Sequence, residues 1–354
     1  MRSDVYSPLK IVHHAARVKA IGTGEVRYPV HVQLVPTNVC NHRCRFCAYR
    51  AHGYSSAEQF NVKDTIPEAR LLSLVDELAE CGVQAVQLTG GGEPTIHPAF
   101  NRLCQRLYEQ GLEVGLVTNG SRLSSTTHLE SMLRMKWVRV SVDAGRAETY
   151  GATREVPPEI YGQVRNGIHR LSTARKGSEP VIGVGFVVTP YNWEEVYEAA
   201  LNAKADGADN FRISAEFQNE GAAHFASMHT RAYSLCKQCE DLADKHFTVF
   251  NRFGERLQDL VDKAPEYPVC AQQYLTTYIG ADMCVYRCCV YAYSERGYLC
   301  SVKDRTFAEA WSNPETQTRL RDCDPRACAR CMYHGTNRLA NYMLNPNPPH
   351  VNFV

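Results

Sequence analysis

Three cysteines stand close together in the segment Cys40-Asn-His-Arg-Cys44-Arg-Phe-Cys47. Their spacing allows one short loop to hold three corners of a cubane iron–sulfur cluster, and such clusters normally take four cysteine ligands. A loop that offers only three thiols leaves one iron open, just as a catalytic metal site keeps one position free for its substrate. The segment therefore predicts a [4Fe–4S] cluster that can bind one further ligand.

A structural zinc ion is the alternative reading of three close cysteines. Such a site usually includes a fourth Cys or His at short spacing, commonly as two C-x2-C pairs. His42 lies inside the loop, too close to its neighbours to complete a tetrahedron with all three thiols. We therefore prefer the cluster, and keep a non-catalytic zinc-binding scaffold as the hypothesis outside the enzymes.

The loop resembles the signature of the radical S-adenosylmethionine (SAM) superfamily, C-x3-C-x2-C with an aromatic residue before the last cysteine, here Phe46. The resemblance covers about residues 30 to 335. It implies that Cys40, Cys44 and Cys47 hold a [4Fe–4S] cluster whose open iron binds SAM. It also implies reductive cleavage of SAM to a 5′-deoxyadenosyl radical, which removes a hydrogen atom from the substrate, and an electron donor such as flavodoxin or ferredoxin.

A glycine-rich segment, Thr89-Gly-Gly-Gly92-Glu93-Pro94, follows the second expected strand. Glycines at a strand end let a ligand approach the backbone closely, and a neighbouring carboxylate can accept hydrogen bonds from an ammonium group. An ordinary turn could carry the same glycines. The resemblance places a Gly-Gly-Glu-Pro motif here, and implies that the amino group of SAM is bound by Gly91, Gly92, Glu93 and Pro94.

Polar residues also end the next two expected strands, with Asn119 after the third and Ser141 and Asp143 after the fourth. Residues i and i+2 of a strand point the same way, so we expect Ser141 and Asp143 to face the barrel interior. The resemblance implies that this pair meets the ribose of SAM, and we count Asn119 among the cofactor-binding residues. Arg154 matches an arginine that pairs with the SAM carboxylate in similar enzymes, although a surface arginine at a helix start is the alternative.

The second group of cysteines lies near the C-terminus, at Cys270, Cys284, Cys288, Cys289, Cys300, Cys323, Cys328 and Cys331. Together with Phe307-Ala-Glu-Ala-Trp311, it resembles the SPASM/Twitch extension of radical SAM enzymes, in which a β-hairpin, a short helix and a closing C-x2-C pair enclose an auxiliary [4Fe–4S] cluster. No cysteine follows Cys331, so we expect the shorter Twitch version with one cluster. Its implied ligands are Cys270, Cys288, Cys328 and Cys331.

Some cysteine assignments stay open. Cys289 could replace Cys288 as a ligand, because adjacent residues on a strand face opposite ways. Cys284, Cys300 and Cys323 have no assigned role, although one of them could donate a hydrogen atom to a substrate radical.

The elements that must position these residues follow a βα pattern, in which apolar β-rich runs alternate with amphipathic stretches. We predict strands over 30–35, 85–89, 113–117, 137–142, 181–188 and 209–213, and helices over 68–81, 192–206 and 223–246. Six strand–helix units are fewer than the eight of a closed barrel, and the resemblance implies an α/β fold with a partial (β/α)6 TIM-like barrel. Ligands of parallel sheets bind beyond the carboxyl ends of the strands, where these motifs fall.

We divide the chain into five expected parts. They are an N-terminal extension (1–28), the radical SAM partial barrel (29–222), a helical connector (223–264), a small cysteine-rich Twitch-like hairpin and helix domain (265–335) and a C-terminal tail (336–354).

The composition limits the classes of partner that we expect. The 354 residues carry 39 basic against 38 acidic side chains, so nothing in the overall charge indicates a nucleic acid or an anionic membrane as partner. The N-terminus lacks the apolar core of a signal peptide and no run is long enough to span a membrane. We expect a cytoplasmic protein, in which fifteen cysteines indicate metal clusters rather than disulfides.

The expected activity is that of a radical SAM enzyme, most simply an oxidoreductase. An auxiliary cluster could accept the second electron of a substrate radical, which favours a two-electron oxidation of a small molecule such as a sugar or natural-product intermediate. Epimerisation or cross-linking of a ribosomal peptide is the alternative within the class. The 39 residues before Cys40 are too few for the peptide-recognition domain that many such maturases carry. Beyond the cluster, the sequence identifies no catalytic residue.

Overall fold

One ten-stranded sheet organises the computed structural model, which describes residues 5–25, 27–50, 58–216, 221–254, 265–329, 331–350 and 352. The strand order is β10-β9-β8-β1-β2-β3-β4-β5-β6-β7. Strands β8 and β1 to β7 are parallel to one another, and β9 and β10 continue the sheet from β8 in antiparallel pairing. The strands are β1 (His31–Leu34), β2 (Ala85–Leu88), β3 (Glu113–Thr118), β4 (Trp137–Ser141), β5 (Val181–Val188), β6 (Asn210–Ala215), β7 (Thr248–Asn251), β8 (Thr276–Ile279), β9 (Cys284–Tyr286) and β10 (Tyr298–Ser301).

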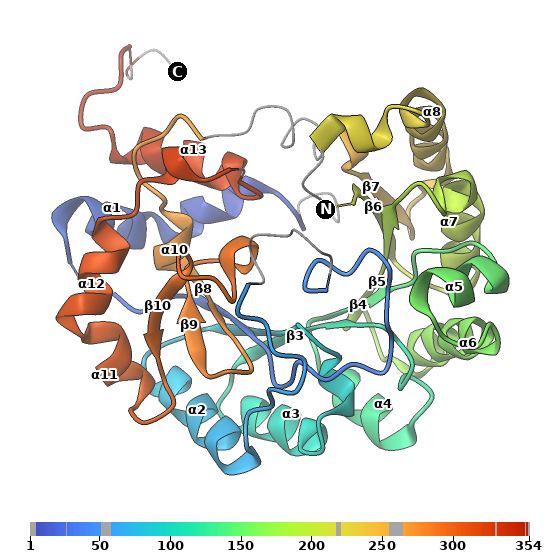
Figure 1. Cartoon of the computed structure of the whole chain (residues 1–354), viewed down its shortest axis with the longest axis horizontal. Coiled ribbons are helices and arrows are strands. Elements are labelled where there is room, and N and C mark those ends of the chain that lie inside the picture. Colours follow the sequence, from blue (N-terminus) through green and yellow to red (C-terminus); the bar gives the residue numbers. More distant parts are fainter. Residues whose placement is uncertain are drawn as a thin grey trace.

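Helices cover the outside of the parallel strands, and Figure 1 shows α2 to α7 as an arc around them. The α-helices are α1 (Ala15–Thr23), α2 (Glu68–Glu80), α3 (Phe100–Glu109), α4 (Thr126–Met132), α5 (Ala147–Arg154), α6 (Glu159–Ala174), α7 (Val196–Ala205), α8 (His229–Gln238), α10 (Gln272–Leu275), α11 (Phe307–Ser312), α12 (Pro314–Arg321) and α13 (His334–Leu344). The 3-10 helices are η2 (Pro8–His14), η4 (Pro94–Ile96), η5 (Trp193–Glu195), η6 (Gly221–Phe225), η7 (Cys239–Leu242), η8 (Cys289–Tyr291) and η9 (Pro325–Ala327).

Residue pattern explains how strands and helices meet. In β1 and β2, buried residues alternate with half-buried ones, so each strand has an apolar face and a more polar face. Helix α2 buries Leu71, Leu74, Val75 and Leu78, a spacing that places all four on one face. The apolar faces of the strands and helices form one large core, and the polar faces, with Gln33 and Gln87, line a cavity inside the barrel.

All six predicted barrel strands are present, each within two residues of its predicted ends, so the partial barrel is confirmed. The prediction of one long helix over 223–246 is wrong. That stretch contains η6, α8 and η7 as separate pieces. The region expected to be a helical connector also contains β7, which pairs with β6 from Asn210 opposite Thr248. The four residues of β7 are too few to show a strand periodicity.

The cysteine-rich C-terminal region continues the barrel sheet. β8 pairs in parallel with β1, with His31 opposite Thr276, and β9 and β10 form the expected hairpin. The short helix α11 begins with a capping box in which Thr306 and Glu309 bond to each other's backbone N–H groups. Its Trp311 is fully buried.

The N-terminal segment lies against the C-terminal helix. A small apolar cluster joins Ile11 and Val18, from η2 and α1, to Ala340 of α13, and Figure 1 shows α1 beside α13. Residues of the N-terminal segment, including Tyr6 and Pro8, also line the cavity inside the barrel. Within the described residues, no helix combines the length and the apolar character needed to cross a bilayer.

Candidate radical SAM active site

The three-cysteine loop begins just beyond the carboxyl end of β1, and the glycine-rich segment holds its start in place. Gly92 N donates to Thr37 O at 3.2 Å, and Glu93 N donates to Val39 O at 2.9 Å. A Cβ atom on Gly92 would overlap the carbonyl of Val39. Glycine is therefore required here because the backbone before Cys40 lies directly against it.

The middle of the loop lies against the end of α5. Arg43 N donates to Arg154 O at 3.0 Å, and Arg45 N donates to Thr153 O at 2.9 Å. The last carbonyl groups of a helix have no partner within the helix, so the loop satisfies them. This contact brings Arg154 beside the cysteines.

The thiols of Cys40, Cys44 and Cys47 are half-buried. His42 N lies 3.4 Å from Cys40 Sγ, and Arg154 Nη1 lies 3.7 Å from Cys44 Sγ. Burial raises the pKa of Cys44 to about 11, against the lowering effect of Arg154. Three gathered thiols with N–H groups directed at their sulfurs form a donor set suited to an iron–sulfur cluster, whose sulfurs commonly accept such bonds.

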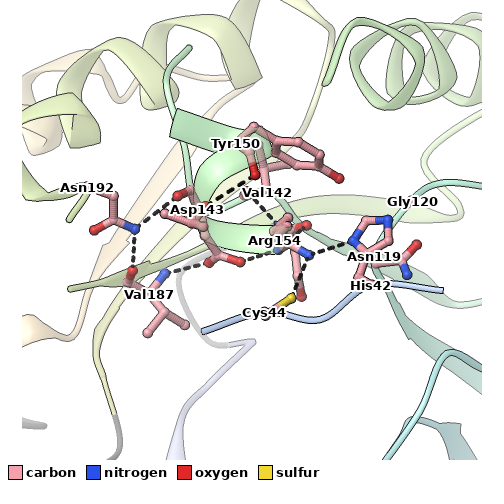
Figure 2. A network of polar contacts seen from close by, with 12 residues as sticks. His42, Cys44, Asn119, Gly120, Val142, Asp143, Tyr150, Arg154, Val187 and Asn192 are labelled. Atoms are coloured by element: carbon pink, nitrogen blue, oxygen red, sulfur yellow. Dashed lines mark hydrogen bonds and ion pairs between the residues drawn. The ribbon is translucent and has the colours of Figure 1, made fainter. Parts of the chain in front are cut away.

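Arg154 is the centre of a buried polar network (Figure 2). Its guanidinium donates to the carbonyls of Val142 at 3.1 Å and Ser141 at 2.7 Å, and it forms an ion pair with Asp143. Burial alone would lower the pKa of Arg154, but Cys44 and Asp143 hold it above its usual value. A permanently charged guanidinium therefore lies beside the cysteine loop.

His42 completes this network from within the cysteine loop. Its Nδ1 lies 3.5 Å from Arg154 Nη1. Burial, together with the charge of Arg154, lowers the pKa of His42 to about 3, so its imidazole is neutral at physiological pH. A neutral imidazole can accept a hydrogen bond from the guanidinium.

Asp143 is held in an unusual backbone conformation, with φ of 57°. Asn192 donates to its carbonyl oxygen at 2.9 Å, and Val187 N donates to its carboxylate at 2.7 Å. The strand ends at Ser141, so the alternation rule does not extend to Asp143. Its carboxylate lies against Arg154 and β5, and the assignment of Ser141 and Asp143 to the ribose of SAM stays a prediction.

Glu93 is 2% exposed, and four donors fix its carboxylate. Oε1 accepts from the N–H and the hydroxyl of Thr95 and from the hydroxyl of Thr118, and Oε2 accepts from Asn119 N at 2.6 Å. A carboxylate oxygen can accept more than one bond. Oε2 thus retains capacity for an ammonium group, which fits the predicted contact with the amino group of SAM.

Asn119 connects the ends of β1 and β3. Its amide nitrogen donates to Asn41 Oδ1 at 2.9 Å, inside the cysteine loop, and its Oδ1 accepts from Ser121 N at 2.9 Å. The predicted residues Cys40, Cys44, Cys47, Gly91, Gly92, Glu93, Asn119 and Arg154 are therefore joined around one end of the barrel.

A second group of thiols gathers in the C-terminal region. Burial, with Cys323 and then Cys331 and Cys328 as neighbours, raises the pKa of Cys270 to about 12. Cys270 in turn helps to raise the pKa of Cys288. The side-chain amide of Asn337 lies 3.7 Å from Cys331 Sγ and 4.0 Å from Cys270 Sγ. The four predicted ligands thus lie in one neighbourhood, which suits a second cluster.

Cys288 and Cys289 face different surroundings. Cys289 Sγ lies 3.2 Å from the hydroxyl of Tyr333 and lines the cavity inside the barrel. Its position supports Cys288 as the ligand, a choice that the sequence left open. Cys323, to which the sequence assigned no role, lies close enough to Cys270 to act on its pKa and is a further candidate ligand.

No three His, Cys, Asp or Glu side chains within the described ranges converge closely enough to hold a single metal ion. In a cubane cluster each thiolate binds a different iron, so its ligands need not converge on one point.

Sequence reasoning missed several residues that shape the site. Asn192 supports Asp143, and the buried Glu195 accepts from the N–H groups of Gly145 and Arg146 at 2.9 and 3.0 Å, which caps the start of α5. His42 was considered only as a zinc ligand. Arg139, half-buried within β4, lines the interior cavity. A charged residue at an inward position of a strand was the available signal for Arg139.

Comparison with known proteins agrees with this geometry. The family model of the radical SAM superfamily matches residues 34–203. The chain is 29% identical over 130 residues to an S-adenosylmethionine-dependent nucleotide dehydratase of Flammeovirga pacifica, a match that covers 37% of this chain and 41% of that protein. It is 30% identical over 141 residues to a GTP 3',8-cyclase of Psychromonas ingrahamii, which covers 39% of each. The matched part is less than half the length of both relatives.

Solved structures share the fold at low identity. SuiB of Streptococcus suis bound to S-adenosylmethionine superposes with a TM-score of 0.62 at 14% identity, over 88% of this chain and 72% of SuiB. At this identity the likeness shows a shared architecture, which includes the cysteine-rich C-terminal region of this chain because most of the chain is covered.

Proposed function

Since the chain belongs to the radical SAM superfamily, we propose that it cleaves SAM reductively and removes a hydrogen atom from a small-molecule substrate in the barrel. A [4Fe–4S] cluster on Cys40, Cys44 and Cys47, with SAM on its open iron, would supply the 5′-deoxyadenosyl radical. The match to a superfamily of enzymes argues against a non-catalytic zinc scaffold.

The observation that carries the proposal is that Arg154 and Glu93 both lie against the cysteine loop. Arg154 contacts Cys44 and pairs with Asp143, and the Glu93 carboxylate is linked through Asn119 to Asn41 of the loop. Arg154 places a guanidinium next to the loop, and its 3.7 Å contact with Cys44 Sγ is the one that the carboxylate of SAM would replace. Glu93 offers negative charge at the glycine-rich segment, which suits its ammonium group. The carboxylate and the ammonium group of SAM would thus each have a partner of opposite charge, Arg154 and Glu93, beside the three thiols.

A small substrate fits the interior of the barrel. The cavity below the site has a volume of about 430 Å³, within the range of roughly 300–1,000 Å³ found for small-molecule sites. Two of the relatives are named for nucleotides, a dehydratase and a GTP cyclase, and their names support a small molecule. SuiB, which shares the fold, has also been solved bound to the precursor peptide SuiA, but 14% identity carries no information on the substrate of this chain.

We further propose a net two-electron oxidation. Removal of a hydrogen atom leaves a substrate radical, and the loss of one more electron and a proton to solvent completes the oxidation. An auxiliary cluster on Cys270, Cys288, Cys328 and Cys331 would provide the electron acceptor. The gathering of these thiols in one neighbourhood supports this part of the proposal.

The test is reductive SAM cleavage by anaerobically reconstituted protein. With dithionite as reductant, wild-type protein is expected to release 5′-deoxyadenosine, and a variant with Cys40, Cys44 and Cys47 replaced by Ala is expected to release none while keeping the iron of the C-terminal group. Cys81→Ala, a half-buried thiol at the end of α2, is the matched control and should behave as wild type. Formation of 5′-deoxyadenosine by the triple variant would disprove the assignment.

A further inference from the structure

The cavity inside the barrel carries an unusual balance of charge. Its lining residues are Tyr6, Pro8, Gln33, Tyr49, Gln87, Thr89, Arg139, Arg212, Arg252, Tyr278, Cys289, Met332, Tyr333, Gly335 and Thr336. Three arginines are present, and no Asp or Glu is among these described residues. Thr89 is the first residue of the glycine-rich segment, so the cavity reaches the proposed SAM site. We name this cavity the arginine chamber.

Arg139 is the central cation of the arginine chamber. It lies in β4 opposite Gly183 of β5 and Val117 of β3. A Cβ atom on Gly185 would stand 3.8 Å from Arg139 Cδ. Because glycine has no side chain, β5 leaves space beside the Arg139 side chain. The structure shows no hydrogen bond or ion pair between the side chain of Arg139 and another described residue. The charge of Arg139 lowers the pKa of Asp143, but that carboxylate pairs with Arg154.

Arg212 and Arg252 approach from the neighbouring strands. Arg212 lies in β6 opposite Gly185, and its guanidinium carbon is 5.2 Å from the centroid of the Tyr6 ring. Arg252 follows β7, where its backbone N–H donates to Ile213 O at 3.0 Å. Strands β4 and β6 and the residue after β7 thus each contribute an arginine to the lining of this cavity. Only β5 stands between Arg139 and Arg212, and it carries Gly183 and Gly185 at the paired positions.

We propose that the arginine chamber binds a phosphate-bearing small molecule as the substrate of this enzyme. Guanidinium groups bind phosphate oxygens in pairs of parallel hydrogen bonds, and Arg139 lines the cavity without a hydrogen bond or ion pair to another described residue, so its N–H groups are available to a bound anion. Tyr49, Tyr278 and Tyr333 give the opposite wall aromatic surface for the uncharged part of the molecule. The inference rests on the proposed function only in calling the bound molecule a substrate.

Equilibrium binding measures this directly and needs no turnover. Holoenzyme with SAM and without reductant is titrated calorimetrically with each ribonucleoside triphosphate, with tripolyphosphate and with the four nucleosides. We expect at least one triphosphate to bind and to weaken as salt is raised, and the nucleosides not to bind. Arg139→Gln should weaken that binding about ten- to a hundredfold, because one charge-assisted contact is lost, and Arg139→Lys should recover part of it.

Two controls keep the result interpretable. Arg102→Gln makes the same change of charge on an exposed arginine that pairs with Glu68 outside the barrel, and should bind anions as wild type does. Arg212→Gln serves as a second chamber variant if Arg139→Gln loses iron or melts at a lower temperature. Binding of tripolyphosphate as tight as that of a triphosphate would show that phosphate alone is recognised, and still supports the inference.

The inference is overturned if no phosphate compound binds, or if the chamber variants that keep their fold bind it as tightly as Arg102→Gln does. Either result leaves the proposed function standing, because reductive SAM cleavage is measured without any substrate. Loss of SAM cleavage together with intact anion binding would instead reject the proposed function and retain the anion site.

Discussion

Arg154 and Asp143 form an ion pair in which each side chain is only 2% exposed, directly beside a cysteine loop. Removal of one partner from a buried pair leaves an uncompensated charge and commonly costs about 3–5 kcal/mol. We therefore expect Arg154→Met to lower the free energy of unfolding by this amount, measured by chemical denaturation.

The double variant Arg154→Met with Asp143→Asn separates stability from SAM binding. Asn tolerates a φ of 57° and can still accept a hydrogen bond from Val187 N, so most of the lost stability should return. If Arg154 binds the SAM carboxylate, the double variant should remain about ten- to a hundredfold weaker for SAM. A single variant as stable as wild type would contradict the buried-charge argument.

Glu93 combines a structural and a binding role, and Glu93→Gln should reveal both. An amide can offer only one oxygen, so either the Thr95 and Thr118 donors or Asn119 N lose their acceptor. We expect unfolding to become easier by about 1–3 kcal/mol and SAM affinity to fall about ten- to a hundredfold. Thr118→Val, which removes one donor and no charge, is the control. An unchanged dissociation constant for SAM would leave Glu93 a structural role alone.

The C-terminal cysteines can be tested by separating radical formation from product formation. Cys328→Ala with Cys331→Ala should still release 5′-deoxyadenosine but make no oxidised product, since the substrate radical has no acceptor for its second electron. Circular dichroism must first show that the region is folded, because a metal site contributes much of the folding energy of a small unit. Normal product yield would favour redox-neutral chemistry.

The ligand set of the second cluster is open to a direct comparison of iron content. Cys288→Ala should lose iron, whereas Cys289→Ala should keep it because Cys289 faces the arginine chamber and contacts Tyr333. Among the neighbouring thiols, Cys323 has the largest effect on the pKa of Cys270. Loss of iron in Cys323→Ala would make Cys323 a ligand, and unchanged iron content would make it only a neighbour of the cluster. Equal iron loss in Cys288→Ala and Cys289→Ala would overturn the proposed division of roles.

His31 should make stability depend on pH. Burial, with Lys10 as a smaller cause, lowers the pKa of His31 to about 4 in the folded state, below its unfolded value near 6.5. The unfolded state therefore binds a proton first as pH falls, and stability declines by about 1.4 kcal/mol per pH unit below about pH 6.5. Between pH 6.5 and 5 we expect a loss of about 2 kcal/mol, which His31→Gln should remove. Parallel pH profiles for both proteins would contradict it.

Regular patterns made the barrel predictable from sequence. The strand from Val181 to Val188 has its predicted ends because it is a continuous apolar run. The helix that begins at Glu68 ends one residue before its predicted end, and its apolar residues follow the helical period. The break between η6 and α8, the four-residue β7 and the pairing of β8 with β1 depend on tertiary contacts that no local pattern carries.

The candidate site was predictable only where a motif named its residues. Cys44 and Glu93 belong to such motifs, and the structure joins both to the same loop. The position of Asp143 could not follow from strand alternation, because its left-handed backbone depends on Asn192, 49 residues away. Likewise, the sequence did not show that Arg139 lines the same cavity as Arg212, because Arg212 lies on a strand two positions along the sheet.

The pairing of β1 with β8 also determines the order in which this protein can assemble. His31 and Thr276, which stand opposite each other, are separated by 245 positions along the chain. During synthesis β1 therefore remains an open sheet edge until β8 has left the ribosome, and an open edge can pair with other chains. Shortening the chain before β8 should therefore yield aggregated protein, even though every residue of the cysteine loop is present.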